Sequence, residues 1–120
     1  IQAIEKFHRF LGSTFTFPAP CLDGREIDLK QAATLLAERL VDIFRRDASG
    51  LIPAFPADSP HQTDPHWREL LLFHEYFHGE TGQGLGAAHQ TGWSGLVANL
   101  VMRRYQRDIP EFWRRQRSSV

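Results

Sequence analysis

Apolar residues recur at three- and four-residue intervals in two stretches of the first half of the chain, and this spacing predicts two amphipathic helices. The first runs from residue 1 to residue 11 and stops at Gly12. The second begins at Asp28, where Gln31 completes a capping-box pattern, and ends in arginines at 45 and 46. Its apolar stripe comprises Leu29, Ala33, Leu36, Leu40 and Phe44. Residues 13–26 contain two prolines and an Asp-Gly pair, which predict a loop or a short extended excursion.

Two more helices are predicted in the second half. Three prolines make residues 51–63 a loop, and Asp64 followed by Pro65 suits the start of a helix that reaches about Leu72. Four glycines oppose a helix over residues 73–88. The last helix is expected from about residue 93 to residue 106, on the apolar positions Trp93, Leu96, Val97, Leu100 and Val101. Few segments alternate as strands do, so the predicted class is all-α, about four helices with long loops.

The composition is that of one globular domain or a piece of one. The 120 residues are 42% hydrophobic and 23% charged. A formal net charge of zero gives no electrostatic reason to expect nucleic acid, and the arginine-rich stretch after Val101 is interpreted as a solvated helix end. No apolar stretch is long enough to span a membrane, and there is no signal-peptide pattern. Together with the single Cys21, these features favour the cytoplasm.

The segment from Phe73 to Trp93 has the composition of a functional site. It holds two carboxylates, three imidazoles and five of the nine glycines of the chain. Glycines let the backbone approach other groups closely, aromatic rings form a wall, and carboxylates transfer protons. Three kinds of chemistry fit this combination: zinc, dinucleotide binding and carbohydrate hydrolysis.

The zinc hypothesis rests on His74-Glu75-Tyr76-Phe77-His78, which fits the His-Glu-x-x-His pattern of zinc hydrolases. On a helix this pattern places both imidazoles on one face. A third ligand is required, and the extended motif expects glycine and histidine where this chain has Thr81 and Gly84. Zinc is therefore a less favoured alternative.

The dinucleotide hypothesis rests on Gly82-x-Gly84-x-x-Ala87, with Asp108 at a suitable distance. That fingerprint has meaning only after a strand and within a βαβ unit. Nothing in the pattern of this chain predicts such a unit.

The carbohydrate hypothesis rests on a longer run, Phe-His-Glu-Tyr-Phe-His-Gly-Glu-Thr-Gly-x-Gly-Leu-Gly-Ala-x-His-Gln-Thr-Gly-Trp-Ser-Gly-Leu-Val-Ala, at residues 73–98. This run resembles the C-terminal active-site segment of glycoside hydrolase family 63, which includes processing α-glucosidases and mannosylglycerate-hydrolase-like enzymes. The resemblance extends upstream through Asp-Pro-His-Trp-Arg at residues 64–68 and Phe-His-Arg-Phe at residues 7–10. The skeleton is also similar to that of inverting trehalases.

The resemblance implies a fold and a reaction. Family members are (α/α)6 toroids, two concentric rings of helices, so residues 1–120 are expected to be the C-terminal portion of a single catalytic domain. The chain opens inside a helix with no capping residue before Ile1, which agrees with that expectation. The implied reaction is inverting hydrolysis, in which one carboxylic acid protonates the leaving oxygen and a second carboxylate activates a water.

The resemblance also implies residue roles. Glu75 matches the general base. The expected substrate-binding residues are Tyr76, Phe77, His78, His89, Gln90 and Trp93. Core packing is the competing role for Phe77 and Trp93, and a structural histidine is the competing role for His89. Glu80 is interpreted as an acceptor for backbone N–H groups, Trp67 and Phe73 as core residues, and neither a metal nor a cofactor is expected.

The resemblance places the general acid, an Asp, upstream of the residues present here. We therefore expect part of an α-glycosidase acting on α-linked glucosyl or mannosyl substrates, which needs the upstream remainder of its catalytic domain and is inactive alone. The alternative is a noncatalytic helical domain that retains a sugar-binding or interaction surface.

Overall fold

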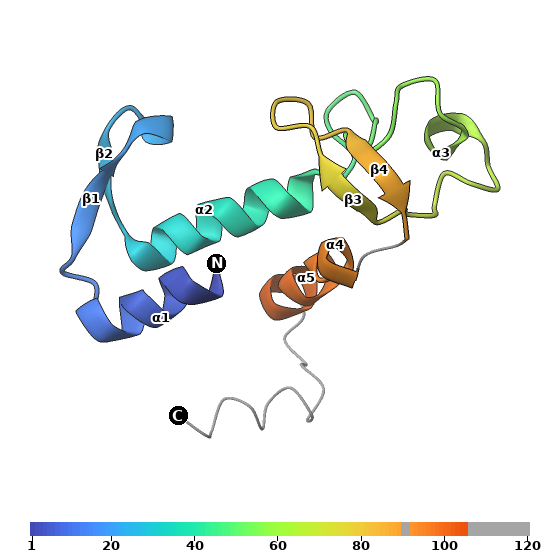
Figure 1. The fold of residues 1–120 in the computed structure, drawn as a ribbon. Coiled ribbons are helices and arrows are strands. Elements are labelled where there is room, and N and C mark those ends of the chain that lie inside the picture. Colours follow the sequence, from blue (N-terminus) through green and yellow to red (C-terminus); the bar gives the residue numbers. More distant parts are fainter. Residues whose placement is uncertain (90–91, 106–120) are drawn as a thin grey trace. The chain divides into compact units, whose positions relative to one another are not determined.

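The computed structural model describes residues 1–89 and 92–105 and divides into two compact units, residues 1–40 and 41–120 (Figure 1). The prediction of an all-α protein is wrong, because two antiparallel two-stranded sheets accompany the helices. The described residues form no concentric rings of helices, so the expected piece of an (α/α)6 toroid is also wrong. The chain is a mixed α/β structure of small elements.

The first unit consists of a helix, a hairpin and most of a second helix. Its elements are α1 (Gln2–Leu11), β1 (Thr16–Ala19), the short 3-10 helix η1 (Pro20–Leu22), β2 (Arg25–Asp28) and the beginning of α2 (Leu29–Asp42). Gly12 ends α1 as predicted, with a φ of 74° and its N–H donating to the carbonyl of His8. The predicted excursion at residues 13–26 is the β1–β2 hairpin, which turns through Asp23 and Gly24, both at positive φ.

The β1–β2 hairpin gives a weak sequence signal because each strand has only four residues. Phe17 pairs with Ile27 across the sheet, and Ile27 is buried. Pro18 lies within β1, where its missing N–H is tolerated because both strands of a two-stranded sheet are edges. Four residues with a proline among them are too short a run for alternation to identify a strand.

The capping box at the start of α2 is confirmed. The backbone N–H of Gln31 donates to Oδ1 of Asp28 at 2.8 Å, and the backbone N–H of Asp28 donates to Oε1 of Gln31 at 2.9 Å. The helix ends at Asp42, earlier than predicted, and the chain continues in tighter turns in which Phe44 N–H donates to the carbonyl of Val41.

The second unit contains short helices and the second hairpin. Its elements are the end of α2, α3 (Pro60–Thr63), β3 (His74–Phe77), β4 (Gly84–Ala88), α4 (Gly92–Gly95) and α5 (Val97–Tyr105). The predicted last helix appears as α4 and α5. The segment expected to be a loop at residues 73–88 is a hairpin.

The predicted helix at residues 65–72 is wrong, and the helix lies just before it. Ser59 caps α3 by accepting the N–H of His61, and Pro60 occupies the first helical position. A capping residue followed by proline thus occurs twice, at Ser59-Pro60 and at Asp64-Pro65, and the earlier pair begins the helix. Asp64 instead ends α3 and accepts the N–H of His66 at 2.8 Å.

The core of the second unit lies around Ile52, Ala54 and Phe55, against which Ile43, Phe44, Leu72 and Phe77 pack. A buried polar side chain completes it. Gln62 is 7% exposed; its Oε1 accepts the N–H of Ile52, and its Nε2 donates to the carbonyls of Ile52 and Phe55. This amide satisfies backbone groups of a loop that has no strand partner.

A carboxylate organises the loop between α2 and the core. Oδ1 of Asp47 accepts the hydroxyl and the N–H of Ser49 and the N–H of Leu51. These hydrogen bonds, with that from the Ser49 hydroxyl as the largest cause, lower the pKa of Asp47 below its ordinary value. Gly50 closes the loop at a φ of 81°.

None of the helices in the described ranges combines the length and the apolar character needed to cross a bilayer.

Candidate functional site

The β3–β4 hairpin places most of the predicted site residues. The two strands run antiparallel, with His74 opposite Ala88, Tyr76 opposite Leu85 and Phe77 opposite Gly84. Between the first two pairs, one residue of β3 faces two residues of β4. That residue is Glu75, and Gly86 and Ala87 form a β-bulge opposite it. Bulges redirect side chains and are frequent beside active sites.

Gly86 makes room for the carboxylate of Glu75. Its φ is 72°, in the left-handed region that favours glycine. A Cβ built on Gly86 lies 2.6 Å from Oε2 of Glu75 and 2.8 Å from Cε1 of Tyr76. Both side chains therefore lie over this glycine, although neighbouring residues of a regular strand point to opposite faces.

Two hydrogen bonds hold Glu75. The backbone N–H of Ala87 donates to Oε2 of its carboxylate at 3.3 Å. The indole N–H of Trp93, on α4, donates to its backbone carbonyl at 2.7 Å. The side chain is half-buried, and within the described ranges Oε1 accepts no hydrogen bond. One carboxylate oxygen is thus anchored and the other is available.

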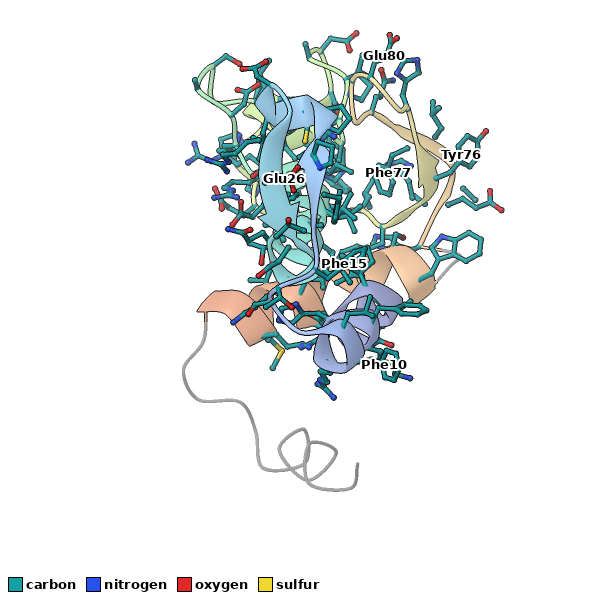
Figure 2. All side chains as sticks on the ribbon, turned by 90° about the vertical axis from the view of Figure 1, so that its left-hand side faces the viewer. Phe10, Phe15, Glu26, Tyr76, Phe77 and Glu80 are labelled. Atoms are coloured by element: carbon teal, nitrogen blue, oxygen red, sulfur yellow. The ribbon has the colours of Figure 1, made fainter. Side chains whose placement is uncertain are left out.

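Exposed aromatic rings adjoin this carboxylate. Tyr76 is 57% exposed and Trp93 is 64% exposed, so both rings offer a face to solvent. Figure 2 shows Tyr76 pointing outward from the hairpin, whereas Phe77 points inward from the same strand. Flat faces of this kind stack on the apolar side of a sugar ring, and they lie beside a group that accepts protons.

Phe77 belongs to the core. Its ring packs edge-to-face on Phe44 at a centroid distance of 5.3 Å. Phe73, predicted to be a core residue, also packs on Phe44, at 5.7 Å. Trp67, assigned to the core as well, is 50% exposed. Core packing, the competing role that the sequence left open for Phe77, is therefore the role seen here.

The tip of the hairpin is built around His78. Its Nδ1 accepts the backbone N–H groups of Glu80 and Thr81, at 3.3 and 3.2 Å. Because Nδ1 is an acceptor in both bonds, the neutral ring carries its proton on Nε2, which is free to donate outward. Glu80 is exposed at this tip (Figure 2). Its predicted role as an acceptor is not seen, since it is His78 that accepts the backbone N–H groups.

His89 lies where the chain leaves β4. It adopts a φ of 60°, its N–H donates to the carbonyl of Phe73 at 2.9 Å, and its ring meets that of Phe73 edge-on. The side chain is exposed. Gln90, the remaining predicted sugar contact, lies outside the described residues.

The strand conformation of β3 and β4 argues against both the zinc and the dinucleotide hypothesis. On a helix His74 and His78 would share one face, but along extended chain four residues span about 13 Å, too far for one ion. In residues 1–89 and 92–105 no three potential ligands gather as a metal site requires. The glycine motif at residues 82–87 lies in the turn before β4 and in β4 itself, antiparallel to β3, and is not a phosphate loop that opens a helix.

Three features of this site have no clear sequence signal: the bulge, the space above Gly86 and the indole hydrogen bond. A glycine in a sequence suggests a left-handed φ, as Gly86 has, but the run at residues 73–93 contains four other glycines that suggest the same. The sequence therefore does not single out Gly86. His74 gives a further example, because its ring occupies the position that a Cβ on Gly84 would need. The glycines of β4 leave space that the side chains of β3 occupy.

Comparison with known proteins gives one relative. The chain is 35% identical over 103 residues, 84% of its length, to Uncharacterized protein YMR196W of Saccharomyces cerevisiae. The aligned part covers 10% of that protein, so the chain spans about a tenth of the relative it matches. No model of a known protein family and no solved structure matches the chain. The relative carries no activity in its name, so the comparison places this chain beside a much longer protein without assigning it a reaction.

Proposed function

We propose that this chain supplies one wall of the sugar site of an inverting α-glycosidase, with Glu75 as the general base. The observation that carries the proposal is the state of one carboxylate: Oε2 of Glu75 is anchored by Ala87, while Oε1 accepts no hydrogen bond within the described ranges and adjoins exposed rings. An anchored carboxylate with a free oxygen orients a water, and the aromatic faces orient a sugar.

In the proposed reaction Oε1 of Glu75 accepts a proton from a water whose oxygen attacks the anomeric carbon. The bond from that carbon to the leaving oxygen breaks, and a carboxylic acid on the opposite side of the sugar protonates the leaving group. Attack from the opposite face inverts the anomeric configuration. We assign the acid to polypeptide outside these 120 residues, because the run at residues 73–98 resembles only the segment that holds the base.

Two histidines extend this wall. His78 is exposed at the hairpin tip and its Nε2–H is a donor for sugar hydroxyls, and the exposed ring of His89 lies at the end of β4. Tyr76 and Trp93 supply stacking faces. Phe77 is left out of the proposal because its ring packs in the core.

Glycoside binding tests the sugar site without requiring turnover. We expect methyl α-D-glucoside, methyl α-D-mannoside or maltose to give saturation-transfer NMR signals with the chain, and Tyr76→Ala to weaken that binding several-fold. Trp67→Ala is the matched control, since Trp67 is 50% exposed but lies on a different loop. Equal losses in the two variants, or no binding of any of the three sugars by the unmodified chain, would contradict the proposal.

A further inference from the structure

The exposed ring of Trp93 makes one specific contact that stacking on a sugar does not require. Its indole N–H donates to the carbonyl of Glu75 at 2.7 Å, shorter than the ordinary length for an N–H···O bond. With 64% of the residue exposed, burial of apolar surface contributes little to fixing this side chain. The hydrogen bond fixes it instead, and it ends on the residue that carries the candidate base.

The segment that follows β4 is attached to β3 at two points. The first is the hydrogen bond from the His89 N–H to the carbonyl of Phe73, at 2.9 Å. The second is the bond from Trp93 to Glu75. Since Phe73 and Glu75 are two residues apart, their carbonyls leave an extended strand on the same side. The two bonds together tie the beginning of α4 to the stretch of β3 that leads into the bulge.

The bulge makes the direction of the Glu75 carboxylate sensitive to the backbone of that same residue. The carboxylate reaches Ala87 through a bond of 3.3 Å, slightly longer than the ordinary range for N–H···O bonds, and it lies in the space that Gly86 leaves open. A small rotation of the Glu75 peptide therefore breaks this contact. The 2.7 Å bond from Trp93 is the shorter and stronger of the two constraints on the residue.

We infer that Trp93 is a positioning residue for Glu75: its indole N–H sets the backbone of Glu75 so that Oε2 meets the Ala87 N–H and Oε1 remains available. This inference rests on the proposed function and deepens it, because the ring that stacks on a sugar also orients the base. A sugar that covers the ring shields the indole hydrogen bond from water, so occupancy of the site strengthens the hold on Glu75.

The amide proton of Ala87 reports on this arrangement without any sugar. An ionised carboxylate is a stronger acceptor than a carboxylic acid, so the Ala87 signal moves as Glu75 takes up a proton in an acid titration followed by 15N NMR. We expect Glu75→Gln to abolish that movement. Trp93→Phe, which keeps a ring but removes the donor, is expected to reduce the movement at least two-fold, and the matched control Trp67→Phe is expected to keep it.

A full Ala87 response in Trp93→Phe would overturn the inference. If Trp93→Phe does not fold, indole hydrogen exchange in the unmodified protein decides: we expect the Trp93 indole proton to exchange at least ten-fold more slowly than that of Trp67, and equal rates would overturn the inference. Failure of the chain to bind any of the three sugars, methyl α-D-glucoside, methyl α-D-mannoside and maltose, while the Ala87 response depends on Trp93 would refute the sugar site and support the positioning role.

Discussion

The carboxylate of Glu75 lies directly over Gly86. The residue has no Cβ, and the side chain of Glu75 occupies the position that a Cβ would need. The same glycine supplies the left-handed φ of the bulge. Two demands, one of backbone geometry and one of space, therefore fall on a single position, and substitutions can separate them.

Gly86→Ala is predicted to displace the carboxylate of Glu75 while costing about 1–2 kcal/mol in stability, the ordinary cost of a left-handed alanine. The closest clash falls on Oε2 of Glu75, the far end of a flexible side chain, which can swing away, while Cε1 of Tyr76 at 2.8 Å must also shift. The Ala87 amide proton should then no longer respond to protonation of Glu75. Gly50→Ala is the matched control, with a φ of 81° and open space around its Cβ; it should lose similar stability and keep the Ala87 response. A response retained in Gly86→Ala would show that the carboxylate does not depend on this space.

Asp47 predicts an acid-sensitive loop. Its pKa is lowered in the folded chain, first by the hydrogen bond from the Ser49 hydroxyl. A lowered folded pKa means that the stabilising contribution is present above the unfolded pKa and disappears as the pH falls through the folded one.

Asp47→Asn keeps the acceptor oxygen but removes the charge. The wild-type chain should therefore be the more stable of the two near neutral pH, with the difference vanishing as the pH falls below the ordinary pKa of an aspartate, 3.8, and through the lowered pKa of Asp47 in the folded chain. Urea denaturation followed by tryptophan fluorescence measures this, since all three tryptophans lie in residues 41–120. A stability difference that does not change with pH would contradict the role of the charge.

At the scale of elements, the helix signals were more reliable than the strand signals. The capping box at Asp28 and the stop at Gly12 appear as predicted, because both depend on neighbouring residues only. Strand β4 could not be predicted from residues 84–88, since glycines there suggest a loop. These residues form a strand because the side chains of β3, His74 and Glu75 among them, occupy the space above the glycines.

The same distinction applies to the candidate site. The sequence identified Glu75, Tyr76 and Trp93 as residues to examine, and the structure brings these three together. It did not indicate that Trp93 is held by its N–H, and it left Phe77 open between a sugar contact and core packing, because both depend on how β3 meets segments distant in sequence. Residue types are readable from a sequence; the face on which a four-residue strand places them is not.

Gln62 links α3 to the loop that holds Ile52 and Phe55 and is predicted to be the most sensitive polar residue of the core. Gln62→Met keeps the volume but leaves the N–H of Ile52 and two carbonyls without this partner, so we expect a loss of about 2–3 kcal/mol in the free energy of unfolding. Urea denaturation measures it. Gln83→Met is the control, because the side-chain amide of Gln83 makes no hydrogen bond within the described ranges, and it should change stability by less than about 0.5 kcal/mol. Similar losses in the free energy of unfolding for the two variants would contradict the structural role of Gln62.

At the scale of the whole molecule, the chain has two units, and the candidate site lies entirely in the second. Its relative is about ten times the aligned length. A single wall that carries a base agrees with a site whose remaining groups come from other polypeptide, and we propose that arrangement here. The all-α expectation failed because the strands have only four or five residues each, too few for alternation to identify them. The toroid expectation failed because the resemblance was carried by a motif, and a motif specifies residues more closely than it specifies the elements that hold them.

Hydrolysis of α-D-glucosyl fluoride and α-D-mannosyl fluoride tests the role of Glu75 most directly. Fluoride leaves without being protonated, so the reaction needs the base and the attacking water but not the missing acid. We predict that the chain hydrolyses at least one of these fluorides about 100-fold faster than the spontaneous reaction, with the inverted sugar as the first product seen by NMR. Glu75→Gln should return the rate to the spontaneous one, and Glu80→Gln, at the exposed tip of the same hairpin, should leave it unchanged. Spontaneous rates in the unmodified chain, or undiminished turnover in Glu75→Gln, would contradict the assignment of Glu75 as the base.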